Sequence, residues 1–264
     1  LTTLQAFIEL EFEKWYTAQY PRTGERELKN LRVNFPTLLP MQLRDINASL
    51  LEKLRTEMLN QKKSNATINR RFTTLKSVLS RAVEWEVIPS HDLNKLKPLI
   101  EDNSRIRYLS FDEEERLRKA LTARDLRIKR ERESGNKHRA ERGYPLLPSL
   151  STRTFADYLE PLVILAMNTG MRRGELFSLR WQNVNLERDF LTIEAANAKS
   201  GKARHIPLNQ KAKSALTNWR GDCESPLWVF EGKPEQPLTD IKKAWSTVLE
   251  EARIKDFRFH DLRH

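Results

Sequence analysis

Cysteine and long apolar runs are the two features that this sequence lacks most clearly. Its single cysteine, Cys223, excludes a disulfide framework and indicates a reducing compartment. No apolar run approaches the roughly 20 residues that a membrane-spanning helix requires, and the N-terminus has no signal-peptide pattern. Hydrophobic residues make up 39% of the 264 residues and charged residues 31%, which is typical of a globular chain. The sequence therefore predicts a soluble cytoplasmic protein with no membrane partner.

Acidic residues are too few to balance the basic ones, so the formal net charge is +11. Between Gln61 and Arg81 there are six basic residues and no acidic residue. An exposed helix face normally mixes the two signs, so this face favours phosphate as its counter-charge. The alternative is an ordinary exposed basic helix. The candidate DNA-contacting residues in this stretch are Lys62, Lys63, Arg70, Arg71 and Lys76.

Residues 1–100 predict an all-helical bundle that forms a first domain. Apolar residues recur at helical spacing, and Ser64 or Asn65 is a good N-cap for the last helix of the set. The expected helices cover about 4–15, 25–35, 48–60 and 64–83. A polar linker is expected at 101–108.

Residues 109–264 predict a second domain that is mostly helical and carries a small antiparallel sheet. A helix begins after its cap at Ser110, and a basic stretch that is poor in apolar residues follows at 122–142, within an insertion at 122–150. We expect that stretch to be an exposed, mobile excursion, which either contacts DNA or is simply solvated. A helix is expected from Phe155 to Gly170, and a short second helix follows it. Two more helices are expected at 211–219 and 240–252, and a β-hairpin at 190–194 and 203–208. The fold class is therefore mainly α with a small antiparallel β-sheet.

Three motifs in the second domain carry groups suited to phosphate. They are Thr169-Gly-Met-Arg-Arg-Gly-Glu-Leu176, Lys199-Ser-Gly-Lys-Ala-Arg-His-Ile-Pro-Leu208, and His260-Asp-Leu-Arg-His264. Guanidinium, ammonium and imidazole groups can stabilise the extra negative charge of a phosphorane without a metal ion. Zinc is disfavoured at His260 and His264, since their spacing mimics a zinc-protease motif but lacks its glutamate and a third ligand. No metal and no cofactor are expected.

This chain resembles the tyrosine recombinase (phage integrase) family of phages and genomic islands in three motifs that occur in the same order. They are TGxRxxEL, a lysine in a hairpin turn followed by R-x-I-P-L, and HDLRH. The resemblance covers nearly the whole chain, because the N-terminal helical unit is similar to that family's core-binding (SAM-like) domain. It implies that Arg172 and Arg263 clamp the scissile phosphate and that Glu175 supports Arg172. It also implies that His260 hydrogen-bonds the same phosphate or helps to manage the proton of the nucleophile. It also implies that Lys199 is the general acid. Lys202 competes with Lys199 for that role and is otherwise expected, like Arg204, to contact DNA.

The family's reaction also uses a tyrosine nucleophile downstream of the third motif. None of the five tyrosines here has a matching context; they are Tyr16, Tyr20, Tyr108, Tyr144 and Tyr158. We therefore expect this chain to be truncated at its C-terminus and to bind DNA without cleaving it.

For the intact protein the resemblance implies integration or excision of a mobile element through a 3′-phosphotyrosyl intermediate. The implied partner is double-stranded DNA with attachment (core) sites, bound by a homotetramer, with accessory DNA-bending proteins possible, in a bacterial or phage-infected cell and associated with the nucleoid. Resolution of DNA dimers or inversion of a segment remains open. The alternatives are a type IB topoisomerase-like enzyme and a non-catalytic sequence-specific DNA-binding protein.

Overall fold

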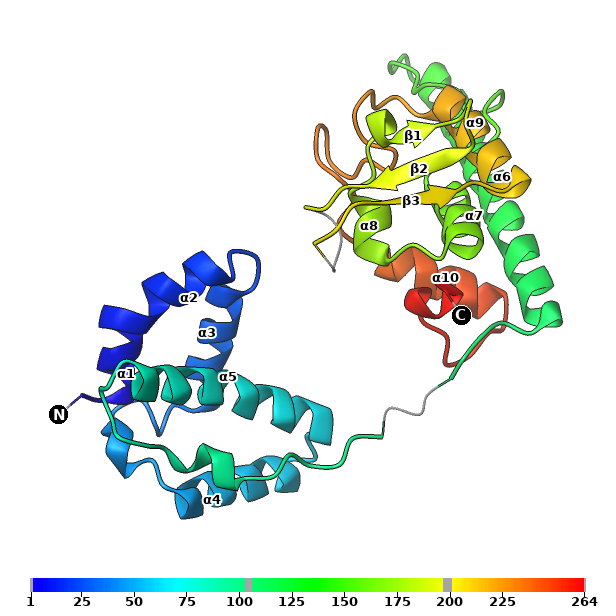
Figure 1. Ribbon diagram of the computed structural model, residues 1–264. Helices are drawn as coiled ribbons and strands as arrows, with labels where there is room; N and C mark the ends of the chain where they lie inside the picture. The colour runs from blue at the N-terminus through cyan, green and yellow to red at the C-terminus, as the bar shows by residue number, and fades with distance from the viewer. Residues whose placement is uncertain (1, 103–105, 197–200, 264) are drawn as a thin grey trace. The chain divides into compact units, whose positions relative to one another are not determined.

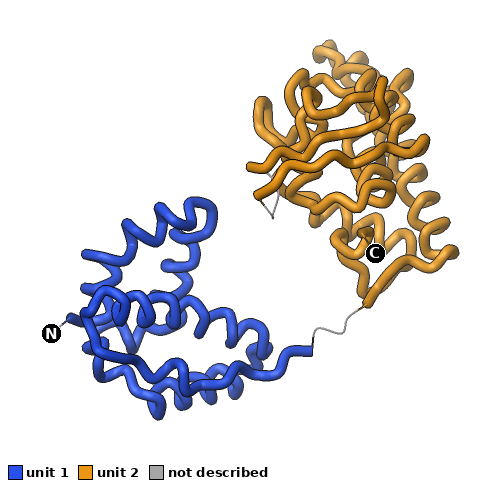
Figure 2. Tube along the Cα trace, in the orientation of Figure 1, with its two compact units in different colours: residues 1–105 blue, residues 106–264 orange. Residues whose placement is uncertain are grey.

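The computed structural model describes residues 2–102, 106–196 and 201–263 (Figure 1). It divides into two compact units, unit 1 (Leu1–Arg105) and unit 2 (Ile106–His264), which Figure 2 distinguishes by colour. Each unit has its own hydrophobic core, so each is described by itself.

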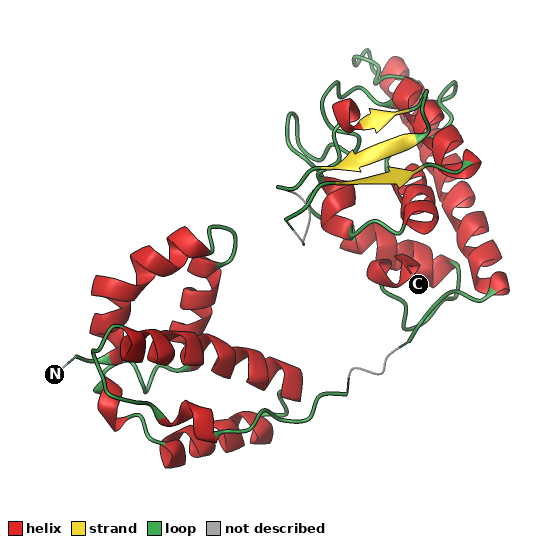
Figure 3. Cartoon of the chain, in the orientation of Figure 1, coloured by secondary structure: helices red, strands yellow, loops and turns green. Residues whose placement is uncertain are grey.

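Unit 1 is helical throughout its regular structure (Figure 3). The sequence-predicted helices are confirmed, and the caps explain where they start. Asn47 Oδ1 accepts the amide of Leu50 at 3.0 Å, and Ser64 Oγ accepts the amide of Thr67 at 3.3 Å. The elements are α1 (Leu4–Phe7), the π-helical turn η1 (Ile8–Phe12), α2 (Glu13–Gln19), α3 (Gly24–Asn34), η2 (Leu43–Asp45), α4 (Ala48–Asn60), α5 (Asn65–Glu84) and η3 (Asp92–Lys95).

Helix α5 supplies much of the core of unit 1. Its residues Ile68, Leu75, Val78 and Leu79 are fully buried, as their helical spacing predicts. The opposite face of α5 is therefore the one that remains for polar and basic side chains.

Unit 2 combines helices with a three-stranded antiparallel sheet of order β1-β2-β3. The predicted hairpin is confirmed, with Leu191 opposite Ile206. The sequence missed β1, since two residues are too short to show an alternation. The elements are α6 (Phe111–Glu141), α7 (Leu159–Thr169), α8 (Arg173–Phe177), η4 (Trp181–Asn183), β1 (Val184–Asn185), β2 (Phe190–Ile193), β3 (Arg204–Pro207), α9 (Gln210–Asp222), α10 (Lys242–Glu251) and η5 (Phe259–Arg263).

Helix α7 is the centre of unit 2, since α6, α8, α9 and η5 all pack against it. It begins at Leu159, four residues later than the sequence indicated. The buried carboxylate of Asp222 accepts the amide of Phe155 at 2.8 Å, and the buried carboxylate of Asp125 accepts the amide of Ala156 at 2.7 Å. Because their amides bind these carboxylates, Phe155 and Ala156 lie outside α7, although the apolar pattern of the predicted helix already starts there.

The sequence interpretation of 122–142 as a mobile excursion is wrong, because α6 continues through it as a single helix to Glu141. Its polar side chains bind the backbone of the returning segment instead of water alone. Lys129 Nζ donates to the carbonyl of Arg153 at 2.7 Å, and Asn136 exchanges hydrogen bonds of 2.8 and 2.9 Å with the backbone of Leu147. A helix that packs through such contacts needs few apolar residues, which is why periodicity failed to reveal it.

Within the described ranges, none of the helices combines the length and the apolar character that a membrane span requires.

Candidate functional site

Arg172 lies in the turn between the C-terminal end of α7 and the N-terminal end of α8. Gly170 ends α7 in the left-handed region with φ +60°, where a glycine is favoured, and its amide donates to the carbonyl of Ala166 at 3.1 Å. Arg172 then adopts an extended conformation as the N-cap residue of α8. Its side chain therefore leaves the turn instead of lying along a helix face.

The carboxylate of Glu175 holds Arg172 in place. Glu175 is 2% exposed, and its Oε2 accepts the backbone amide of Arg172 at 2.8 Å while Oε1 accepts Arg172 Nη1 at 3.1 Å. The same carboxylate accepts Arg204 Nη1 at 3.0 Å and Nη2 at 2.7 Å. One buried anion therefore anchors two guanidinium groups, which come from α8 and from β3.

The ionisation of this cluster follows from its contacts. Burial alone would raise the pKa of Glu175, but the hydrogen bonds from Arg204 and then from Arg172 outweigh it, so the pKa lies below its usual 4.5. The hydrogen bond to Glu175 in turn raises the pKa of Arg204. The carboxylate and the guanidinium are thus charged at neutral pH.

Arg204 has a contact that the sequence did not predict, since its guanidinium donates to Glu175, and its predicted role as a DNA-contacting residue stays a prediction. A signal for this existed in the strand pattern. Arg204 and Ile206 lie on the same face of β3, and Ile206 packs against the core, whereas His205 between them is exposed. Its partner, 29 residues away in sequence, was not visible to motif reasoning.

The predicted general acid, Lys199, lies outside the described residues. Its competitor Lys202 is described, and it is exposed on the connection between β2 and β3 just after Gly201, whose φ is +67°. The outcome of the choice between the two lysines therefore stays a prediction.

His260 and Arg263 lie in η5, a 3₁₀-helical segment in which residues three apart stand on the same side. Phe259 and Leu262 anchor η5 by their buried side chains, and η5 packs against α7 (Figure 1). His260 is exposed, and His264 lies outside the described residues. Arg172 thus follows the C-terminal end of α7, and η5 packs against the same helix.

Arg263 has an unsatisfied donor. Its Nε is buried and has no hydrogen-bond partner among the described residues. Buried polar atoms are nearly always paired, so Arg263 Nε is an exception among the described residues, as are the indole nitrogens of Trp181 and Trp245.

In unit 1 the predicted basic residues divide into two groups. Lys62, Lys63, Arg70 and Lys76 are exposed, and Arg71 is half-buried. Outside this predicted set, the last basic residue of the stretch has a structural role. Arg81 stacks on Trp15 at 3.8 Å from the ring centroid and forms an ion pair with Glu84 at 2.5 Å.

Arg26 joins the basic group, and sequence reasoning missed it. It lies on α3 and lines, together with Arg70 and Arg71 of α5, a surface hollow of ≈ 380 Å³. The hollow is also lined by the polar side chains of Asn30, Asn34 and Thr67. The carboxylate of Glu27, which accepts the Tyr16 hydroxyl, also lines the hollow. Three guanidiniums outnumber this one carboxylate, which makes the hollow the candidate phosphate-contacting surface of unit 1.

Two of the phenol groups are poor candidates for a nucleophile. Burial raises the pKa of Tyr158, and burial together with a hydrogen bond of 2.6 Å to Glu27 raises the pKa of Tyr16. Both phenols are therefore harder to ionise than a free tyrosine. No group of three or more His, Cys, Asp or Glu side chains in the described part of the chain is placed to hold a metal ion.

Comparisons with known proteins agree with this arrangement. Residues 146–264 match the model of the phage integrase family. The integrase of Salmonella phage P22 is 32% identical over 133 residues, which cover 45% of this chain and 34% of that protein. The chain thus matches only about a third of the length of that relative.

Two solved structures show the same fold over the whole chain. The Tn1549 transposon integrase in complex with a circular intermediate DNA has a TM-score of 0.71 at 14% identity and covers 100% of this chain and 85% of that chain. A lambda integrase tetramer bound to a Holliday junction has a TM-score of 0.67 at 15% identity and covers 99% of this chain and 68% of that chain.

The fold of the chain is therefore that of the integrase structures, and the family match lies in its second unit. Residues 146–264 of the chain are thus similar to the phage integrase family of tyrosine recombinases.

Proposed function

We propose that this protein is a site-specific DNA recombinase in which Arg172 and Arg263 bind the scissile phosphate, and that it integrates or excises a mobile element. The observation that carries the proposal is the tether of Arg172 to the buried carboxylate of Glu175. A guanidinium that is fixed before the substrate arrives loses little entropy on binding and needs little reorganisation as charge develops.

Arg172 keeps donors for a phosphate after it has bound Glu175. Only Nη1 of its guanidinium donates to that carboxylate, and the side chain is 37% exposed. Arg263 contributes a buried Nε with no partner among the described residues. Two guanidiniums of this kind suit the doubly charged equatorial oxygens of a phosphorane better than the singly charged diester, so they favour the transition state.

In the proposed reaction, a tyrosine oxygen attacks the phosphorus and the 5′-oxygen leaves, which yields a 3′-phosphotyrosyl link. Lys199 donates the proton that the departing 5′-oxygen needs, and His260, beside the phosphate, accepts the proton that the attacking phenol loses. Because burial keeps the phenols of Tyr16 and Tyr158 protonated, the proposal assigns the attack to a different tyrosine. Glu175 supports the site from behind Arg172.

Duplex DNA is the proposed partner of both units. In unit 1, Arg26, Arg70 and Arg71 around their common hollow contact phosphates, with Lys62 and Lys63 nearby in sequence. We propose a homotetramer on DNA, in analogy to the lambda integrase tetramer bound to a Holliday junction, assembled on attachment sites in the cytoplasm of a bacterial or phage-infected cell.

The test uses the complete gene product and a nicked duplex with the site that the protein selects from a random library. Arg172→Ala and Arg263→Ala should each slow covalent complex formation by about a hundredfold, while affinity for the duplex changes little. Arg173→Ala is the matched control, because Arg173 is the adjacent arginine and lies over the ring of Phe177 at 5.8 Å.

A second substrate separates the acid from the phosphate-binding residues. On a duplex with a 5′-bridging sulfur, the leaving thiolate needs no proton, so the defect of Lys199→Ala should largely disappear and that of Arg172→Ala should persist. A wild-type protein that binds its selected site but never forms a covalent complex would instead support a non-catalytic DNA-binding function.

A further inference from the structure

Arg107 lies where the chain enters unit 2, which begins at Ile106. Its guanidinium forms a bidentate ion pair with Glu113 in the first turn of α6, with Nη1–Oε2 at 2.8 Å and Nη2–Oε1 at 2.6 Å. Glu113 Oε2 also accepts the amide of Ser110 at 3.1 Å, as part of the capping box that starts α6. The Arg107 and Glu113 side chains are only 23% and 19% exposed. Arg107 is thus fixed to the beginning of α6.

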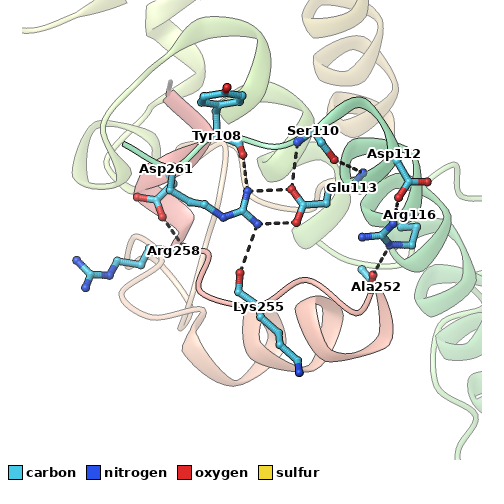
Figure 4. Close-up of polar contacts among 10 residues, drawn as sticks. Tyr108, Ser110, Asp112, Glu113, Arg116, Ala252, Lys255, Arg258 and Asp261 are labelled. Atoms are coloured by element: carbon cyan, nitrogen blue, oxygen red, sulfur yellow. Dashed lines mark hydrogen bonds and ion pairs between the residues drawn. The ribbon is translucent and has the colours of Figure 1, made fainter. Parts of the chain in front are cut away.

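The same guanidinium also contacts the loop between α10 and η5 at Lys255, which is labelled in Figure 4. Arg107 Nη2 donates to the carbonyl of Lys255 at 3.3 Å, and Arg107 Cζ lies 5.1 Å from the centroid of the Phe257 ring. Phe257 is buried and packs against Trp245 of α10. The loop is therefore held by the core on one side and by Arg107 on the other.

This loop leads directly into the motif that carries the proposed phosphate-binding residues. Two residues separate Phe257 from His260, and the amide of Arg258 donates to Asp261 Oδ2 at 2.8 Å at the start of η5. A 3₁₀ segment of five residues is too short to be stable by itself. Its position depends on the contacts of Phe259 and Leu262 with the core and on the loop that precedes it.

We propose that Arg107 is a positioning residue for the phosphate site, and that it couples the entry of unit 2 to the placement of His260 and Arg263. The contact spans 148 residues of sequence, from the entry of unit 2 to the loop before η5. The inference rests on the proposed function, in which Arg263 binds the scissile phosphate.

The chemistry of the contact requires an arginine. The planar guanidinium binds both Glu113 oxygens, a carbonyl and an aromatic face at the same time, whereas a lysine ammonium can replace only part of this set. Arg107→Ala removes all these contacts and leaves the capping box of Ser110 and Glu113 in place. Arg107→Lys retains the charge but not the geometry.

A matched control lies one turn away from this cluster. Arg116 of α6 also reaches across to the C-terminal part of unit 2, where its Nε donates to the carbonyl of Ala252 at 2.9 Å. Figure 4 shows this contact at the end of α10, apart from the Lys255 contact. Arg116→Ala therefore removes a comparable guanidinium without releasing the loop before η5.

The experiment combines single-turnover cleavage at saturating DNA, DNA affinity, and hydrogen exchange of the amides in 253–263, with α7 as the internal reference. Arg107→Ala should slow cleavage by about tenfold or more, because small misplacements of a positioned group cost rate steeply. DNA affinity should stay at the wild-type level, and exchange should accelerate in 253–263 and not in α7. Arg107→Lys should remain slow, and Arg116→Ala should match the wild type in rate and exchange.

The proposal would be overturned if Arg107→Ala cleaved DNA at the wild-type rate. It would also be overturned if Arg116→Ala lost as much cleavage rate as Arg107→Ala, since that result would mean a general loosening of unit 2. Failure of the proposed function appears differently, as no cleavage by the wild type or no effect of Arg172→Ala. In that case the exchange measurement decides alone. Faster hydrogen exchange in 253–263 in Arg107→Ala, but not in Arg116→Ala, supports the positioning role. Unchanged exchange in Arg107→Ala refutes it.

Discussion

Glu175→Gln removes one negative charge from the phosphate site and leaves the shape of the side chain nearly unchanged. In the wild type, the Glu175 carboxylate accepts four hydrogen bonds, from the amide and Nη1 of Arg172 and from Nη1 and Nη2 of Arg204. A glutamine keeps one carbonyl oxygen as an acceptor and presents an NH₂ group to guanidinium donors. The variant should therefore lose both the ion pairs and part of the hydrogen bonding.

The cost can be bounded from the burial of the three side chains. Removing one partner of a buried ion pair destabilises a protein by about 3–5 kcal/mol. Arg172 and Arg204 are 37% and 35% exposed, so water can compensate them in part, and we expect about 3 kcal/mol, the lower end of that range. For a unit of this size, that loss corresponds to a decrease in melting temperature of about 6–12 °C.

Calorimetry checks this value, because unit 1 has its own core and provides an internal reference transition. Glu187→Gln, at an exposed position of unit 2, is the matched control and should melt like the wild type. The pH dependence gives a second check. The pKa of Glu175 lies below 4.5 in the folded state, so its stabilisation is present above about pH 4.5 and is lost as the pH falls through the lowered value. Unchanged melting of unit 2 in Glu175→Gln at neutral pH would refute the reasoning.

Three further predictions concern other parts of the molecule. Arg70→Ala with Arg71→Ala should weaken DNA binding and reduce the slope of log K against log salt by about 1 per arginine. Desolvation, together with the charge of Lys76, lowers the pKa of His91 below 6.5. The imidazole ring is held by two contacts: its Nδ1 accepts the amide of Leu93 at 3.2 Å, and its Nε2 lies 3.0 Å from Ser80 Oγ. As the pH falls, the unfolded state therefore takes up the proton before the folded state does. The free energy of unfolding of unit 1, measured by urea titration, should decrease below about pH 6.5, and His91→Gln should remove this decrease. Gly135→Ala should stabilise unit 2 by about 0.5–1 kcal/mol because its site in α6 is open, whereas Gly170→Ala should destabilise it by about 1–2 kcal/mol because of its positive φ.

Each of these predictions has an outcome that contradicts it. A salt slope unaffected by the double substitution would remove Arg70 and Arg71 from the DNA surface, and Lys53→Ala on the exposed side of α4 serves as the control. An acid-induced loss that persists in His91→Gln would place its origin in another group. Destabilisation by Gly135→Ala would argue against a continuous α6.

Local sequence signals were sufficient wherever a structure depends on neighbouring residues. Ser64 caps α5, Gly170 ends α7, and β2 pairs with β3 as the strand pattern predicted. Capping, positive φ and strand alternation act over a few residues, so they are legible in the chain. The sequence predicted the start of α6 at Ser110 but not its continuation through 122–141, because that part of the helix contacts backbone carbonyls of the segment that follows it and has no apolar period.

The sequence by itself determined which groups are available for phosphate chemistry, since the motifs around Arg172 and Arg263 carry their residue types regardless of how the chain folds. Only the tertiary structure decided how these groups are held. It paired Arg204 with Glu175 over 29 residues and Arg107 with the Lys255 carbonyl over 148. It also left Arg263 Nε buried and unpaired among the described residues. Such contacts depend on the packing of α7 against its neighbours, and a sequence motif contains no information on which distant side chain arrives beside it.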